Sequence, residues 1–217
     1  MQNMEVDQPS LIFENQSWWV LSKPPGWLCI PGRSSGQGSA PPVLSDWLRN
    51  TQAAPVWVTH RIGRETSGLV LFAKTAEAHA QANAWFQQRR IKKTYRCLAR
   101  GKMPFPLLKI SEPIEGAASS TQVERVEQYA QGFLARVYPR TGRRHQIRIH
   151  MAVQGFPLLG DSLYGGPQEL KLRNESVLRI DRVALHASTL ELPSGERFEC
   201  PDPADFSHWR EVLQKDL

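Results

Sequence analysis

The sequence contains little cysteine and no long apolar run. Cys29, Cys97 and Cys200 lie far apart and form no CxxC pair, so a disulfide framework and a zinc knuckle are both excluded. No segment approaches the roughly 18 apolar residues that a membrane span needs, and the N-terminus lacks the apolar core of a signal peptide. We therefore expect a protein of the reducing cytoplasm.

The composition predicts a globular protein with a basic surface. Hydrophobic residues make up 41% of the 217 residues, and seven Trp and eight Phe supply bulky apolar area for a core. There is no internal repeat or Pro-rich linker, so we expect a single domain over residues 1–217, and a monomer. Lys and Arg exceed Asp and Glu by 27 to 21, which favours a polyanionic partner where the cations cluster.

The apolar patterns predict a mixed α+β protein. Alternating or short apolar runs indicate strands, 3.6-residue stripes indicate helices, and Gly/Ser/Pro-rich segments indicate loops. Thr75 is a good N-cap for the second helix. The expected elements are a hairpin over 11–22, a loop over 32–42, a helix around 44–48, a strand over 69–73 with a helix from 75, a strand over 94–98, a hairpin over 121–138, a helix over 144–154 and a strand over 183–192.

Three segments could carry chemistry, and the first spans residues 60–75. Arg61 and Arg64 lie beside a glycine that leads into a buried strand. Such a loop can bring cations to a phosphate or to an unstacked base. On the residues alone, an ordinary solvated surface explains the two arginines equally well.

The second segment, residues 89–101, surrounds Tyr95 with basic residues that include Lys92 and Lys93. Cations can hold a nucleic-acid backbone while a phenol ring stacks on a base. The alternative is a charged helix end followed by an edge strand, where Lys and Arg discourage aggregation.

The third segment, residues 139–155, places Arg144 and Arg148 four residues apart on one expected helical face. A Gly-containing turn that opens a helix can also offer backbone N–H groups to an anion. His145 and His150 have no acidic neighbour in the sequence, which favours packing and hydrogen bonding over metal binding. If the fold brings the three segments together, they form one basic groove.

These segments are similar to the motifs of a known family. Residues 60–74, HRIGRETSGLVLFAK, resemble the signature HRLDxxTSGLLLxAK of RluA-type pseudouridine synthases. Residues 141–150 resemble that family's TGRxHQIRxH, and residues 160–165 its GDxLYG. Shorter matches occur at Lys23-Pro24-Pro25-Gly26, at residues 93–95 and at residues 185–187. Several motifs in the family's order identify the chain as a catalytic domain of this type, and we expect no S4-type domain before it.

The resemblance implies a fold, a reaction and a partner. The fold is α+β, a long and largely antiparallel mixed sheet with flanking helices and a central basic cleft. The reaction converts uridine in structured RNA, ribosomal or transfer, into its C-glycoside isomer without a metal or an organic cofactor. By matched position, Arg61 fills the space of the flipped base, Tyr95 stacks on the uracil, and Arg148 pairs with the catalytic aspartate. The residues expected to contact RNA are Arg61, Arg64, Lys92, Lys93, Arg143, Arg144 and His145.

One position departs from the family pattern: Gly63 stands where the motif has its nucleophilic aspartate. Two acids could substitute. Glu65 would lie on the same face of an extended segment as Gly63, but about 7 Å along it. Asp161 could act as the nucleophile only if the fold places it near position 63. The sequence leaves two interpretations, an RNA-binding protein with impaired isomerase activity, or an active synthase that uses another acid or whose Gly63 is an introduced change. In either case Arg148 has lost its expected partner, so we expect water, an anion or another carboxylate beside it.

Overall fold

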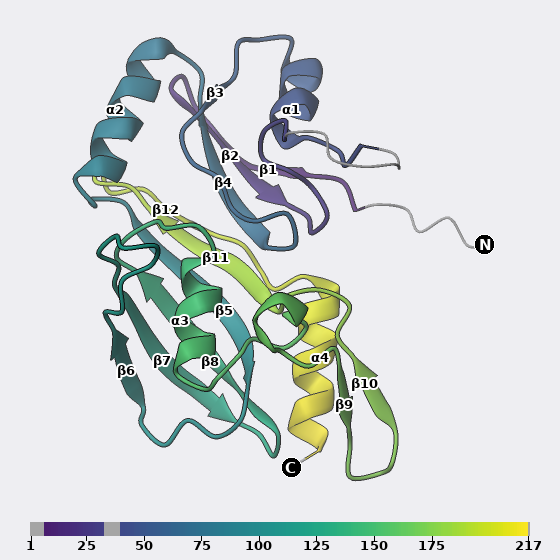
Figure 1. Cartoon of the computed structure of the whole chain (residues 1–217). Coiled ribbons are helices and arrows are strands. Elements are labelled where there is room, and N and C mark those ends of the chain that lie inside the picture. The colour runs from purple at the N-terminus through teal and green to yellow at the C-terminus, as the bar shows by residue number, and fades with distance from the viewer. Residues whose placement is uncertain (1–6, 33–39, 217) are drawn as a thin grey trace. The chain divides into compact units, whose positions relative to one another are not determined.

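The structure is a computed structural model that describes residues 7–32 and 40–216, so most of the predicted loop at 32–42 lies outside the described residues. The chain divides into two compact units (Figure 1). Unit 1 comprises residues 1–91 and 189–200, and unit 2 comprises residues 92–188 and 201–217. The single domain expected over residues 1–217 stays a prediction. No helix among the described residues is both long and apolar enough to cross a membrane.

Unit 1 is built on an antiparallel sheet. The predicted hairpin is present, because Asn15 accepts hydrogen bonds from the backbone N–H groups of Ser17 and Trp18, each 2.8 Å long, and so fixes the turn. The next strand of the sheet is buried along its whole length, as its apolar run predicts. The elements are β1 (Ser10–Glu14), β2 (Trp18–Lys23), β3 (Trp57–Val58), β4 (Ser67–Ala73) and β12 (Arg197–Glu199), with β2 between β1 and β4, β3 beside β4, and β12 beside the end of β11 (Leu185–Glu191).

Two helices belong to unit 1. The first, α1 (Leu44–Gln52), buries Leu44 and Leu48. The second, α2 (Ala76–Gln87), begins after Thr75, whose hydroxyl accepts a hydrogen bond of 3.1 Å from the N–H of Ala78, as predicted. The predicted stripe of α2 packs into the core, where the rings of Trp85 and Trp18 are 5.6 Å apart.

The strands of unit 2 pair antiparallel, and one helix packs on each face of them. Successive residues of a strand point to opposite faces. Cys97 packs in the same apolar cluster as helix α3, whereas Leu98 packs in the cluster of helix α4. The strands are β5 (Lys92–Arg100), β8 (Gly132–Pro139), β7 (Thr121–Gln128) and β6 (Leu107–Ile110), in that spatial order, and the helices are α3 (Gln146–Val153) and α4 (Ala204–Lys215).

The connections of unit 2 are less regular than its sheet. A short 3-10 helix, η1 (Ser162–Tyr164), follows α3, and a small hairpin of β9 (Glu169–Lys171) and β10 (Val177–Arg179) follows η1. Arg182 is buried after this hairpin and binds Asp205 of α4, with 2.6 Å between Arg182 Nε and the carboxylate. This ion pair ties α4 to the segment that leads into β11.

Two predictions about helices need correction. The third helix begins at Gln146 and not at Arg144, because His145 has the left-handed conformation, with φ of 53°. Arg144 therefore lies in the turn before α3 and shares no helical face with Arg148. Helix α4 is absent from the predicted elements, although Phe206, Trp209 and Leu213 form a buried stripe at helical spacing.

Candidate active site

The candidate site residues of unit 1 lie in one tight turn before β4. The backbone N–H of Thr66 donates to the carbonyl of Gly63 at 3.1 Å. Ile62 points into the core, while Arg61 and Arg64 are exposed, as expected of residues that meet a ligand. The extended segment assumed for Glu65 is wrong, because Arg64 and Glu65 form the turn itself.

Gly63 is exposed, and its backbone does not require glycine. It is absent from the residues with positive φ. A Cβ atom added there would meet only the Thr66 side chain, whose hydroxyl would be 3.2 Å away. A shift of a few tenths of an ångström in that hydroxyl admits a side chain. The backbone at position 63 therefore has room for the first atom of a side chain after a small adjustment of Thr66.

Three groups that the sequence analysis did not identify hold this turn in place. Lys23 is fully buried, and its ammonium donates to the carbonyls of Pro24, Trp27 and Arg64 at 2.8, 2.9 and 3.0 Å. The thiol of Cys29 contacts both the N–H and the carbonyl of Ile62, and burial raises the pKa of this thiol. His60 Nε2 accepts from the N–H of Leu71 at 2.9 Å. The KPPG-like segment thus braces the turn through Lys23.

In unit 2, the loop before α3 is fixed by the side chain of Gln146. Its Oε1 accepts from the hydroxyl of Thr141 at 2.6 Å and from the N–H of Arg143 at 3.0 Å. Its Nε2 donates to the carbonyl of Ser120 at 2.9 Å. Arg143 and Arg144 remain exposed on this loop. The TGRRHQ segment is therefore a rigid loop that presents two cations.

Arg148, on the first turn of α3, is paired with Asp161. The guanidinium Nε and Nη2 donate to the two carboxylate oxygens at 2.7 and 2.6 Å. Asp161 is 0% exposed and the Arg148 side chain is 16% exposed. The guanidinium also lies over the ring of Tyr164, 5.0 Å from its centroid. The expectation of another carboxylate beside Arg148 is confirmed.

Asp161 is positioned by a glycine-rich turn. Gly160 has φ of +75°, and a Cβ atom there would overlap the carbonyl oxygen of Arg182. A Cβ atom at Gly166 would likewise overlap the carbonyl oxygen of Leu158. Only glycine allows the chain to pass so close to these carbonyls. The GDSLYG segment is consequently a closely packed turn that buries its single acid.

His145 lies beside the Arg148 and Asp161 pair. Its Nδ1 is 3.0 Å from the hydroxyl of Tyr164. Burial lowers the pKa of His145, the nearby Arg148 and Arg144 lower it further, and Asp161 acts in the opposite direction. Burial and the two arginines therefore both disfavour the charged form of His145.

The candidate site residues Lys92, Lys93 and Tyr95 of the basic segment 89–101 lie at the start of β5. Lys92 is exposed, whereas Lys93 and Tyr95 are partly buried, and burial lowers the pKa of Lys93. Tyr95 packs at the margin of the α3 cluster. Lys93 also approaches the loop before α3, since a Cβ atom at Gly142 would be 3.9 Å from the Lys93 ammonium. The segment thus adds a cation to the exposed arginines of that loop.

His150 is a packing residue, as its sequence context indicates. It is buried, its Nδ1 is 2.8 Å from the hydroxyl of Thr121, and its Nε2 is 3.0 Å from the hydroxyl of Ser119. Within residues 7–32 and 40–216, no three His, Cys, Asp or Glu side chains are grouped so that they could hold a metal ion.

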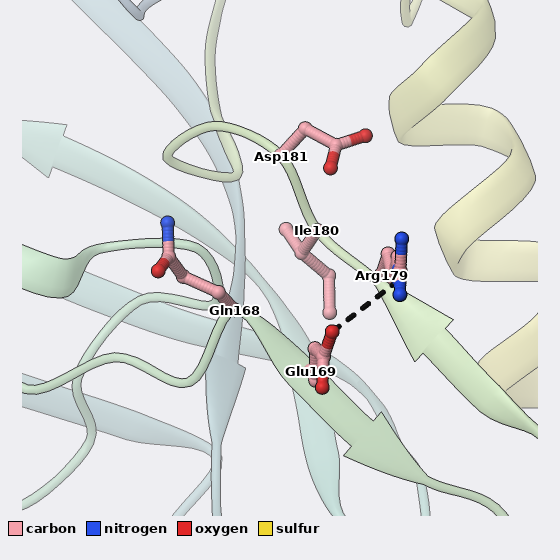
Figure 2. A pocket seen from close by; sticks show the side chains of 5 residues that line it. All are labelled: Gln168, Glu169, Arg179, Ile180 and Asp181. Atoms are coloured by element: carbon pink, nitrogen blue, oxygen red, sulfur yellow. Dashed lines mark ion pairs between the residues drawn. The ribbon is translucent and has the colours of Figure 1, made fainter.

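An open hollow of about 310 Å³ lies at the base of the β9–β10 hairpin (Figure 2). Its lining includes an ion pair between Arg179 and Glu169, with 3.3 Å between Nε and the carboxylate. Both partners are exposed, as in many surface ion pairs that contribute little. None of the predicted site residues lines this hollow, so we assign no chemistry to it.

Comparison with known proteins agrees with these observations. The family model for RNA pseudouridylate synthase matches residues 17–153. The "Uncharacterized RNA pseudouridine synthase YhcT" of Bacillus subtilis is 31% identical over 222 residues, which cover 94% of this chain and 72% of that protein. The "Ribosomal large subunit pseudouridine synthase D" of Haemophilus ducreyi is 32% identical and covers 95% of this chain and 71% of that protein.

Solved structures share the fold. The human RNA Pseudouridylate Synthase Domain Containing 4 superimposes with a TM-score of 0.76 at 22% identity, over 94% of this chain and 92% of the other. The human RNA Pseudouridylate Synthase Domain Containing 1 gives a TM-score of 0.73 at 23% identity, over 99% and 98%. The predicted α+β fold class is confirmed.

Proposed function

Because this chain belongs to the RNA pseudouridylate synthase family, in its RluA-type branch, we propose that it binds structured RNA while its isomerisation of uridine is impaired or absent. The observation that carries this proposal is the glycine at position 63. The family's reaction begins with an aspartate at this position, and Gly63 offers no atom that can attack a sugar or a base.

The environment of Asp161 supports the same proposal. A nucleophile must come within roughly 3 Å of its target with a free oxygen. Both oxygens of Asp161 bind Arg148, and the side chain has no exposed surface. Freeing it would leave the largely buried Arg148 without its partner, which is costly. Asp161 is thus a poor substitute for the missing acid.

RNA binding is supported by the exposed cations. Arg61 and Arg64 extend from the turn of unit 1, and Arg143 and Arg144 from the rigid loop before α3. Arginine forks match phosphate oxygens, and fixed loops lose little entropy when they bind. Lys92, Lys93 and His145 complete the proposed set of contacts. The name of the Haemophilus ducreyi relative favours large-subunit ribosomal RNA as the first RNA to test, with transfer RNA as the second.

A second candidate function is an active synthase that uses Glu65. This acid lies in the same turn as Gly63, and its side chain is partly exposed. It also has Arg64 as an ion partner, with 3.4 Å between Arg64 Nε and the Glu65 carboxylate. This candidate predicts isomerase activity in the native chain that disappears in Glu65→Gln.

A cytoplasmic location and a monomeric state stay predictions.

The deciding experiment measures tritium release from RNA that carries tritium at carbon 5 of uracil. Native protein, Gly63→Asp and Gly63→Asn are compared, because the asparagine variant has the shape of aspartate without its charge. We expect background release from the native protein and from Gly63→Asn, and clear release from Gly63→Asp. Release by the native protein well above the no-enzyme level would contradict impaired activity.

RNA binding is measured on the same three proteins. The affinity should fall steeply between about 50 and 200 mM salt, because phosphate contacts release counterions. Binding that is absent, or that hardly responds to salt, would contradict the RNA-binding half of the proposal. If Gly63→Asp binds RNA without releasing tritium, the catalytic loss extends beyond residue 63.

A further inference from the structure

One edge of the Arg148 guanidinium binds Asp161, and the other edge binds no protein group among the described residues. A guanidinium carries its N–H groups in a rigid plane and can bind two oxygens along one edge. Asp161 takes the edge formed by Nε and Nη2. The other edge, formed by Nη1 and the second hydrogen of Nη2, has no protein acceptor within the described part of the chain. The Arg148 side chain is 16% exposed, so it is not sealed from solvent.

We propose that Asp161 is a positioning residue that holds Arg148 with this second edge directed at a phosphate group of bound RNA. The inference rests on the proposed RNA binding and deepens it, since it assigns a phosphate site to unit 2. Arg148 is then a binding residue in its own right, and its ligand is the RNA backbone.

The surroundings of the pair fix the direction of the guanidinium. Asp161 cannot move easily, because the turn around it passes against the carbonyls of Arg182 and Leu158 with no space for a Cβ atom. The ring of Tyr164 covers one face of the guanidinium. An arginine already fixed in its bound rotamer loses less side-chain entropy on binding than a free one. The pair is thus preorganised for a ligand that approaches the second edge.

The ion pair itself is close to neutral, so the attraction for an anion must come from its neighbours. Arg143 and Arg144 are exposed on the loop that leads into α3, and the Lys93 ammonium lies near Gly142 of the same loop. Burial is the largest cause of the lowered pKa of His145, and Arg148 and Arg144 lower it further against the single opposing effect of Asp161. The loop therefore draws in an anion, and Arg148 supplies directed hydrogen bonds.

A phosphate is the anion that suits this geometry. Two of its oxygens can accept the two parallel N–H groups of a guanidinium edge. A lysine carries the same charge but no such edge. Replacing Arg148 by Lys should consequently keep the attraction to Asp161 and lose the phosphate contact.

The test is a double-mutant cycle on the full chain, with a fluorescein-labelled RNA hairpin as the probe. The Kd is measured for native protein, Arg148→Gln, Asp161→Asn and the variant that carries both changes. We expect Arg148→Gln to raise the Kd about tenfold and to reduce the salt slope by about one phosphate contact. Asp161→Asn should weaken binding in the native background and add almost nothing in the Arg148→Gln background.

Arg179→Gln is the matched control, because Arg179 also pairs with a carboxylate but is exposed on the β9–β10 hairpin. Its Kd should change less than about twofold. Arg148→Lys provides the second variant, needed if Asp161→Asn does not fold, and should bind about as weakly as Arg148→Gln.

Several results would overturn the inference. Fully additive effects of the two single changes would mean that Asp161 does not act through Arg148. Native affinity in Arg148→Lys or in Arg148→Gln would exclude the phosphate contact while leaving RNA binding by the rest of the protein intact. Native protein that binds no RNA would overturn both this inference and the proposed function.

Discussion

The ammonium of Lys23 lies 3.0 Å from the carbonyl oxygen of Arg64, although 41 residues separate them in the sequence. The same ammonium donates to Pro24 and Trp27, so all three of its N–H groups have backbone acceptors. A buried lysine is tolerated only when its charge is satisfied in this way. Lys23, from the KPPG-like segment, is therefore one of the groups that hold the turn carrying Arg61, Gly63 and Arg64.

Replacing Lys23 by Met should destabilise unit 1 and loosen this turn. The substitution keeps the aliphatic volume but removes three hydrogen bonds to backbone carbonyls, at a cost of about 3 kcal/mol in the free energy of unfolding. Urea denaturation measures this cost, and amide hydrogen exchange at residues 62–66 measures the loosening. Lys74→Met is the control, because Lys74 makes a more exposed ion pair with Glu14 and should cost less than about 1 kcal/mol.

Two glycines of the GDSLYG turn should respond very differently to alanine. Gly160 and Gly165 have similar positive φ, +75° and +82°, so both variants strain the backbone by about 1 kcal/mol. Gly160→Ala also forces a methyl group into the carbonyl of Arg182, whereas Gly165 faces open space. We expect Gly160→Ala to lose at least about 2 kcal/mol more than Gly165→Ala. Equal melting temperatures for the two variants would contradict this close packing.

His145 should make the stability of the protein depend on pH. Its pKa in the folded chain lies below its ordinary value of 6.5. The unfolded chain then binds protons more readily, so the free energy of unfolding falls as the pH drops through 6.5 towards the folded-state pKa. NMR titration of the imidazole measures the pKa directly, and Arg144→Gln should raise it.

His145→Asn provides the control for this pH dependence. Asparagine tolerates the left-handed conformation at position 145, so the loop before α3 should keep its shape. The component of the pH dependence due to His145 should then disappear. If the stability of His145→Asn changes with pH as that of the native protein does, another group is responsible.

Much of the fold follows from local sequence patterns. The first hairpin, the buried strand β4 and the start of α2 at Thr75 were predicted because an alternating pattern, an apolar run and a capping residue are local signals. The start of α3 was misplaced because the side-chain contacts of Gln146 with Thr141 and of His145 with Tyr164 hold His145 in the left-handed region. A local sequence pattern does not show these contacts. The helix α4 was missed because its stripe is short and its N-cap, Pro203, has no side-chain donor or acceptor.

The candidate site was predictable in its residues but not in its pairings. The motifs identified Arg61, Gly63, Tyr95 and Arg148 by type and order. The partner of Arg148 could not be inferred, because the turn that delivers Asp161 depends on carbonyls that only the folded chain brings close to Gly160 and Gly166. The role of Lys23 could not be inferred either, because the carbonyls that it binds come together only in the folded chain.

The backbone at Gly63 has a consequence for how this protein can be classified. Since a Cβ atom at position 63 would meet only the Thr66 side chain, we expect Gly63→Asp to change the stability of the fold little. Overall similarity, fold comparison and thermal stability would all place this chain among enzymes of its family. The proposed loss of activity is therefore tested by an assay that follows the breaking of the glycosidic bond, with Gly63→Asp measured beside the native protein.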